Sequence, residues 1–155
     1  MKNLSKVLFA AVFFGALGWL GMYLYWHFKV VGAIKTLETQ AAPAQPGSPL
    51  PYSLPEEPLA EVRSAGCRAL PYLVSSLEPS KSPAYLLGAY DLIHKCVAPS
   101  DPSQAPDFPV DVRPTIDDTA DDRARKCRSV QDWWRARGAE YHQAWRVWKD
   151  RCPRE

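Results

Sequence analysis

Four cysteines are the residues of this chain whose type and spacing could do chemistry. Cys67, Cys96, Cys127 and Cys152 all lie in the C-terminal part of the 155 residues. None belongs to a C-x-x-C pair, the short chelating unit of most structural zinc sites, and no C-x-x-C-H haem attachment sequence is present. Disulfide bonds are therefore the favoured chemistry, with reduced buried thiols and zinc binding as the alternatives.

Their positions predict which cysteines would pair. Cys67 lies in the first helix of a predicted hairpin and Cys96 ends the second, and an antiparallel hairpin brings such points together. Cys127 and Cys152 bracket a Trp-rich segment in the same way if that segment folds back at Gly138. We therefore predict disulfides Cys67–Cys96 and Cys127–Cys152, each closing a loop of roughly 26–30 residues and contributing about 3–4 kcal/mol. Disulfides persist in oxidising compartments, which favours an extracytoplasmic domain.

Other candidate chemistry is missing. The sequence contains no G-x-S-x-G, H-E-x-x-H, P-loop or dinucleotide fingerprint. The three histidines are scattered, and His94 and Cys96 stand two positions apart, which turns them to different sides of a helix. A cluster of acids could attract Ca²⁺, but it lacks the spacing and glycine of an EF-hand and fits a solvated helix start: Asp117, Asp118, Asp121 and Asp122. We predict no catalytic residue, metal or cofactor, and no enzyme.

An uncharged run over residues 7–28 predicts a membrane-spanning helix. At about 1.5 Å per residue such a helix is roughly 33 Å long, which matches the hydrocarbon core of a bilayer. Tyr23, Tyr25 and Trp26 at its far end are the aromatics of a membrane interface, where His27 would also lie. A cleavable signal peptide is the alternative, but its apolar core is shorter than this run. We expect an uncleaved anchor and a helical extension through residues 1–40.

The anchor carries a stripe of small residues that predicts helix packing. The stripe consists of Ala11, Gly15, Gly18 and Gly21, and small residues let a second helix approach closely in lipid. The alternative is that glycine is simply common in membrane helices. Flanking lysines give a slight preference for the N-terminus inside. With the disulfides, this predicts an inner (cytoplasmic) membrane protein, single-pass, with a cytoplasmic N-terminus and a periplasmic domain.

A Pro-rich linker and a helical hairpin follow. Six prolines within residues 41–58 favour an extended, semi-rigid spacer. Residues 59–97 show apolar positions at helical spacing. Pro71 predicts a break near Gly66–Ala69, and Ser82 followed by Pro83 predicts the start of a second helix.

This hairpin carries a family resemblance. A proline embedded in ALPYLVSSL and the apolar A-Y-x-L-I face that begins at Ala89 together resemble one HEAT-type repeat over residues 57–97. The tail VQDWWRARGAEYHQAW is similar to the Trp-rich segment that follows such repeats in some bacterial membrane-anchored or secreted proteins. A solenoid stacks three or more repeats, whereas this chain carries one. The resemblance implies a binding or scaffolding module.

The remaining residues predict an irregular loop over residues 98–120 and a Trp-rich helical segment over residues 121–152. This segment packs on the hairpin as core or forms a contact surface, since Trp and Arg are enriched at interface hot spots. The candidates for partner contact are Trp133, Trp134, Arg135, Arg137, Trp145 and Trp148.

Charge is unevenly distributed along the C-terminal part. Seven acids and one base lie between Asp101 and Asp122, and ten bases and three acids lie between Arg123 and Arg154. Internal compensation explains this pattern, with anionic lipid headgroups or an acidic partner as the alternative. No nucleic-acid-binding motif accompanies the charge, and we predict no such partner.

Together these patterns predict a mainly α protein, with one N-terminal transmembrane helix and a small disulfide-stapled all-α domain over residues 59–155. The favoured function is a non-catalytic accessory or scaffold subunit that contacts the bilayer and other subunits of a larger membrane complex, for which respiratory and photosynthetic complexes are candidate hosts. The alternative is a self-standing membrane-anchored periplasmic module that binds an envelope or protein ligand.

Overall fold

The chain folds into helices joined by turns and one very short β-hairpin. The computed structural model describes residues 2–97 and 108–143, with side chains for residues 13–97 and 108–139. In chain order the elements are α1 (Lys2–Gln40), β1 (Ala42–Pro43), β2 (Tyr52–Ser53), α2 (Glu56–Ala65), the 3-10 turn η1 (Gly66–Ala69), α3 (Leu70–Ser75), α4 (Pro83–Val97), the 3-10 turn η3 (Val110–Val112) and α5 (Ala120–Gln143). The predicted mainly helical character is confirmed.

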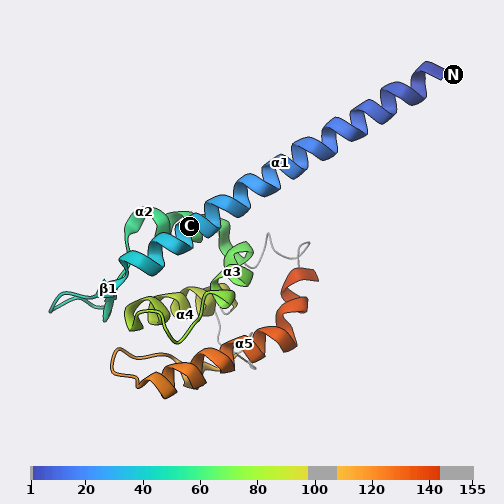
Figure 1. Ribbon diagram of the computed structural model, residues 1–155. Coiled ribbons are helices and arrows are strands. Elements are labelled where there is room, and N and C mark those ends of the chain that lie inside the picture. The colour runs from blue at the N-terminus through green and yellow to red at the C-terminus, as the bar shows by residue number, and fades with distance from the viewer. Residues whose placement is uncertain (1, 98–107, 144–155) are drawn as a thin grey trace.

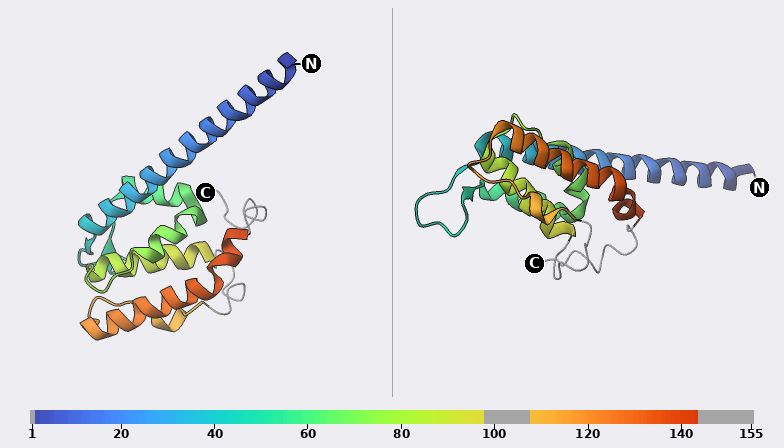
Figure 2. Two further views of the ribbon diagram at one scale, coloured as in Figure 1. Left: turned by 45° about the vertical axis from the view of Figure 1, so that its right-hand side comes forward. Right: turned by 90° about the horizontal axis from the view of Figure 1, so that it is seen from below.

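Helix α1 is a projecting rod for most of its length and a core helix at its end. Its N-terminal part stands clear of the other elements in all three views (Figures 1 and 2). Its last turns pack against α2 and α3. Val30, Ala33, Ile34 and Leu37 recur at helical spacing and are at most 4 % exposed. An ion pair of 3.0 Å between the Glu38 carboxylate and Lys81 Nζ fixes the C-terminal end.

A β-hairpin formed by β1 and β2 then returns the chain to the helices. Ala42 pairs with Ser53 and Pro43 with Tyr52 in antiparallel register. The amide of Ser48 donates to the Gln45 carbonyl at 3.1 Å, and Gly47 adopts a φ of +91°. Pro46 followed by a glycine with positive φ is the sequence of a type II turn. The Pro-rich segment therefore turns back on itself, where a spacer was predicted.

The break predicted within the first helix of the helical hairpin is confirmed. Gly66 ends α2 with a φ of +55°, a conformation that favours glycine. The chain continues as η1 over Gly66–Ala69, and Pro71 stands in the first turn of α3. At this position proline costs no helical hydrogen bond, because the first amides of a helix have no carbonyl partner.

Helix α4 lies at the centre of the core. Ser82 accepts a hydrogen bond from the amide of Tyr85 at 3.2 Å and caps the helix, and Pro83 is its first residue, as the sequence predicted. Its neighbours are α3, η1 and the β-hairpin. Tyr85, Leu86, Leu87 and Ile93 on this helix are essentially inaccessible, so α4 organises the packing of the whole domain.

Helix α5 is continuous through Gly138, so the fold-back on which the Cys127–Cys152 pairing depended does not occur there. The helix runs from Ala120 to Gln143. A Cβ on Gly138 would stand 2.8 Å from Cε2 and 2.9 Å from Cδ2 of Trp134. The glycine therefore makes room for an indole ring that lies over the preceding turn of its own helix.

The predicted membrane anchor is contradicted. Among the residues described in full, 13–97 and 108–139, no helix combines the length, hydropathy and low charge needed to cross a membrane. From residue 13 onward the apolar residues alternate with glycines, interfacial aromatics and His27, and Lys29 follows at once. Residues 7–12 of the predicted span lie outside the described side chains. The predicted single-pass topology and inner-membrane, periplasmic location are corrected with it.

The predicted disulfides are contradicted as well. Cys96 and Cys127 are free thiols, so neither predicted pair forms and no bond joins two cysteines of the described residues. The hairpin does bring Cys67 to the end of α4, but its Sγ lies 3.3 Å from the backbone carbonyl oxygen of Cys96. Cys127 is buried on the core side of α5, and Cys152 lies outside the described residues.

We expect Gly88→Ala to be about 1–2 kcal/mol less stable than Gly32→Ala, because both variants gain helix propensity but only the methyl at position 88 overpacks the contact between α4 and the β-hairpin. A Cβ at Gly88 would stand 2.8 Å from Leu54 Cδ1 and 3.2 Å from Tyr52 Cε2. Urea denaturation followed by circular dichroism measures the loss. Gly32→Ala is the control, because a Cβ there meets nothing within 4 Å; equal stability of the two variants would contradict the close approach.

Candidate functional site: the projecting part of helix α1

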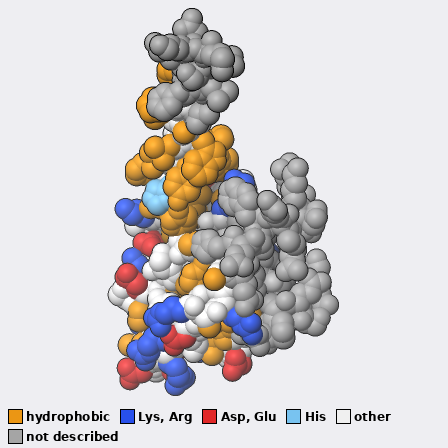
Figure 3. All heavy atoms as spheres, turned by 90° about the vertical axis from the view of Figure 1, so that its right-hand side faces the viewer, with side chains coloured by type: hydrophobic (Ala, Val, Ile, Leu, Met, Phe, Trp, Pro, Cys, Tyr) orange, Lys and Arg blue, Asp and Glu red, His pale blue; other side chains and the backbone are white. Residues whose placement is uncertain are grey.

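The projecting part of α1, residues 13–28, exposes an unusual amount of apolar surface. Ten large apolar side chains in this stretch are 42–71 % exposed: Phe13, Phe14, Leu17, Trp19, Leu20, Met22, Tyr23, Leu24, Tyr25 and Phe28. Apolar side chains cover the described part of the rod above the mixed surface of the domain (Figure 3). Soluble monomers rarely expose a contiguous patch of this kind, which typically marks an interaction site.

These side chains surround the helix. Successive residues turn by about 100° around a helix axis, so neighbours such as Phe13 and Phe14, or Leu24 and Tyr25, point in different directions. No Lys, Arg, Asp or Glu occurs between residues 7 and 28. A helix that is apolar all round is one that other apolar groups enclose.

The predicted small-residue stripe faces open space. A Cβ built on Gly15, Gly18 or Gly21 would meet no atom of the chain within 4 Å. The side chain of Ala11, the fourth member, lies outside the described residues. Nothing in the described chain therefore packs on this part of the helix.

Polar contacts lie where α1 enters the domain, and we call this level the collar. They join His27 to Tyr72 and Lys29 to Glu61. Rings of Trp19, Tyr23 and His27 follow one another along the helix at centroid distances of 5.9 and 6.5 Å. His27 ends this row with its Nδ1 2.7 Å from the Tyr72 hydroxyl of α3. Burial, followed by the proximity of Tyr23, raises the pKa of Tyr72. Lys29 pairs with Glu61 of α2 at 3.2 Å, so the helix is held firmly at its base.

The predicted Trp/Arg contact residues are divided between core and surface. Trp133 is only 8 % exposed and meets Phe108 edge-on, with ring centroids 4.9 Å apart. Trp134 is half-buried, Arg137 is half-exposed, and Arg135 is exposed and paired with Asp132 one turn earlier. Trp145 and Trp148 lie outside the described residues.

Hydrogen bonds to one carboxylate link the irregular loop to the β-hairpin and to α4. Arg113 donates from Nε and Nη2 to the two carboxylate oxygens of Asp91 at 2.8 and 2.7 Å. The Tyr52 hydroxyl donates to the same carboxylate at 3.1 Å. Burial and then the Asp91 charge raise the pKa of Tyr52 to about 12, so the phenol stays protonated and donates at neutral pH.

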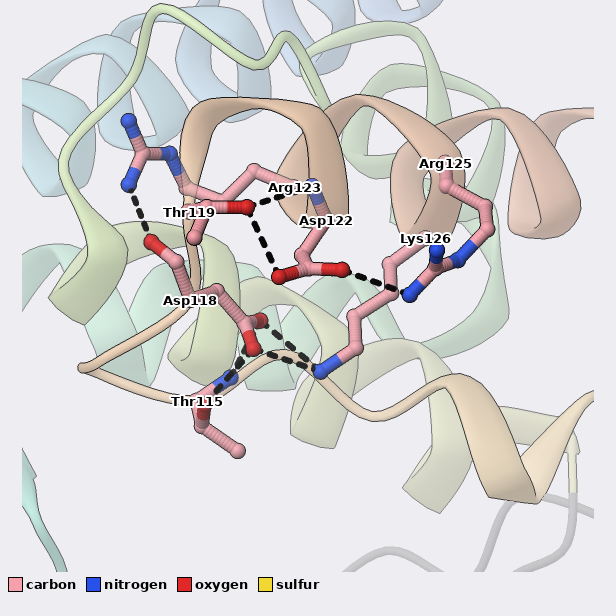
Figure 4. A network of polar contacts seen from close by, with 7 residues as sticks. All are labelled: Thr115, Asp118, Thr119, Asp122, Arg123, Arg125 and Lys126. Carbon is pink, nitrogen blue, oxygen red and sulfur yellow. Dashed lines mark hydrogen bonds and ion pairs between the residues drawn. The ribbon is translucent and has the colours of Figure 1, made fainter.

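The acidic cluster at the start of α5 forms a helix cap (Figure 4). Thr119 Oγ1 accepts from the Asp122 amide at 3.1 Å, and Asp122 pairs with Arg125. Asp118 accepts from Thr115 and from Lys126. These carboxylates are already occupied by protein donors, and the described residues contain no group of three His, Cys, Asp or Glu placed to hold a metal ion.

The described thiols are poor nucleophiles. Burial raises the pKa of Cys96 to about 11, and burial also raises the pKa of Cys127. A thiolate is the reactive form of cysteine, and apolar surroundings disfavour it. Among the described side chains, the exposed apolar residues of the rod are thus the best candidates for binding another molecule.

Comparison of this chain with models of protein families, with curated proteins and with solved structures found no match.

Proposed function

We propose that the protein is a non-catalytic scaffold or accessory subunit that inserts the projecting part of α1 into an apolar groove between helices of a larger partner protein. The observation that carries the proposal is the set of ten large apolar side chains exposed around residues 13–28. Their burial in a partner would remove from water the surface that the chain itself leaves uncovered.

The size of this surface suits a stable complex. Aromatic side chains bury roughly 150–250 Å² each, so ten large side chains about half exposed offer on the order of 1,000 Å². One partner in a standard protein–protein interface buries about 800 Å². Only a partner that covers most sides of the rod reaches this area, because any single side carries about half of these side chains at most.

This requirement favours a groove over a second copy of the chain. Two copies packed rod against rod would cover one side of each helix. The opposite side of each helix would stay in water. If the side of Leu20 and Leu24 formed the contact, Phe14, Met22 and Tyr25 would remain exposed. A groove between several helices covers them together and matches the absence of charge on every side of the rod.

The rest of the domain suits the role of a rigid base. Because Leu37 and its neighbours are core residues, the rod cannot swing freely about a linker. The α2–α4 hairpin, with its likeness to one HEAT-type unit, and the exposed face of α5 around Arg135 supply surfaces for a second contact with the same partner. None of this involves bond making or breaking.

Purification of the tagged chain from its native host under mild conditions tests the proposal. We expect a stoichiometric complex with a partner protein, and we expect the double variant Phe14→Asp, Leu24→Asp to lose that partner at least tenfold. The two positions lie on different sides of the rod and are exposed, so the variant should keep its circular dichroism spectrum and melting temperature.

Leu50→Asp is the matched control, because Leu50 is an equally exposed apolar residue on the hairpin. It should retain the partner. A chain that purifies alone and monodisperse would overturn the proposal. Flotation of the pure chain with lipid vesicles, with no stoichiometric protein partner, would overturn it as well.

A further inference from the structure

One side of the rod carries large apolar residues further toward the domain than the other sides do. Its members stand at spacings of 4, 3, 4, 4 and 3, which keeps them on one side of a helix. The stripe consists of Phe13, Leu17, Leu20, Leu24, Phe28 and Val31. The first five are exposed, and Val31, beyond the collar, is half-buried. At about 1.5 Å per residue this stripe is roughly 27 Å long.

The other described sides of the rod end earlier. The side of Met22 and Tyr25 reaches Lys29, which is paired with Glu61 of α2. The side of Trp19 and Tyr23 runs into the domain, where His27 meets Tyr72. Among the described sides of the rod, the stripe that ends at Val31 is thus the one whose run of large apolar side chains continues past the collar.

We propose that this stripe is the primary seam of the complex, along which one uncharged helix of the partner packs directly. The inference rests on the proposed function, because it names the face of the rod that the groove contacts most closely. The seam has the composition of a helix–helix contact, with aliphatic Leu17, Leu20 and Leu24 between aromatic ends. The remaining sides of the rod are then covered more loosely by neighbouring elements of the partner.

Area and charge identify the occupant. At about half exposure, the seam side chains offer on the order of 500 Å², short of the roughly 800 Å² per partner in a standard interface. A lone helix or a second copy on this seam is therefore too small, and the helix must belong to a larger body. The exposed Lys35 follows Val31 by one turn on the same side, so the partner helix ends near an acidic residue.

Site-specific cross-linking in the native host tests the seam. A photo-reactive phenylalanine analogue replaces Leu20, on the seam, or Met22, two positions away and on another side; both are exposed in the free chain. We expect Leu20 to cross-link efficiently to one helical segment of a single protein. Met22 should give at least fivefold less of that product. In pull-downs, Leu20→Asp should lose the partner at least tenfold and more strongly than Met22→Asp, whereas Leu50→Asp, outside the rod, should keep it.

The outcomes separate the two proposals. Equal cross-linking and equal partner loss for the two positions would overturn the seam while the proposed function stands. Cross-links from Leu20 to a second copy of the chain would also overturn it. Absence of any protein product from both positions, with no stoichiometric partner in the pull-down, would overturn the proposed function together with the seam.

Discussion

A chain that begins at residue 41 should fail to fold, whereas a chain that begins at residue 29 should keep the domain intact. The two truncations differ only in the last part of α1. This part carries Val30, Ile34 and Leu37, which lie in the core against α2 and α3. The rod that both truncations remove makes few contacts with the domain, at the level of His27 and Tyr72.

The expected loss of unfolding free energy on removal of the last part of α1 distinguishes a core helix from a tether. Burying a Val, Ile or Leu side chain contributes about 1.5–3 kcal/mol, so loss of these three costs roughly 5–9 kcal/mol. The whole free energy of unfolding of a small domain is about 5–15 kcal/mol. Removal of α1 also exposes the faces of α2 and α3 that it covers. Little or no stability remains for the shorter chain.

Far-UV and near-UV circular dichroism with urea titration measure this difference. The chain from residue 29 should melt cooperatively, within about 1 kcal/mol of the full chain. It loses the His27–Tyr72 contact but keeps Lys29 beside Glu61, and such partly exposed polar contacts contribute little. Cooperative unfolding of the chain from residue 41, with similar stability, would show that α1 is only attached to the domain.

The sequence predicts local structure well where one residue type dictates it. Ser82 with Pro83 starts α4, and Gly66 with Pro71 interrupts the first half of the hairpin. A proline or a capping serine acts on the backbone within one turn, so its effect depends little on distant contacts. The continuation of α1 to Gln40 follows equally from an unbroken run of helix-compatible residues.

The same sequence misleads about what α1 packs against. The absence of charge over residues 7–28 predicted an anchor with an extension through residue 40, separate from the domain, whereas the residues from Val30 onward belong to the domain core. The signal for this core segment was present, because Val30, Ile34 and Leu37 recur at helical spacing among Lys35, Thr36 and Glu38. Periodicity identifies a buried face but does not identify its partner, which here is α2 and α3.

Tertiary distances account for the remaining errors. Hairpin topology brings Cys67 to the end of α4, where its Sγ lies 3.3 Å from the Cys96 carbonyl oxygen, but the Cys96 side chain itself is a free thiol and not the predicted partner. A glycine such as Gly138 permits a fold-back of the chain, but here it accommodates the ring of Trp134 within a continuous helix. The exposed seam on the rod follows from the sequence only once the structure has shown which side of α1 the domain covers.

The second large effect concerns Asp118, which joins the loop to α5. Its carboxylate accepts from the Thr115 amide and hydroxyl at 2.8 and 2.7 Å and from Lys126 Nζ at 2.7 and 2.9 Å. Burial alone would raise its pKa, but the hydrogen bonds from Lys126 and Thr115 outweigh burial and lower it below the ordinary 3.8. Hydrogen bonds to a charged group contribute about 1.5–3 kcal/mol, and we expect Asp118→Asn to cost about 2 kcal/mol at pH 7.

The pH dependence has a definite sign. Because the pKa is lower in the folded chain than in the unfolded chain, the stabilisation by Asp118 is complete above about pH 4 and is lost as the pH falls through the folded value. The difference in unfolding free energy between wild type and Asp118→Asn should therefore be constant from pH 7 to about pH 5. It should shrink below pH 4.

Asp132→Asn is the matched control for this prediction. Asp132 stands on the same helix and pairs with Arg135, but both side chains are more than 60 % exposed. Exposed pairs of this kind contribute at most about 0.5 kcal/mol, so the control should match wild type at every pH. Urea titrations of all three proteins between pH 7 and pH 3 give the comparison. A gap for Asp118→Asn that persists unchanged at pH 3 would mean that the side chain stabilises the loop without its charge.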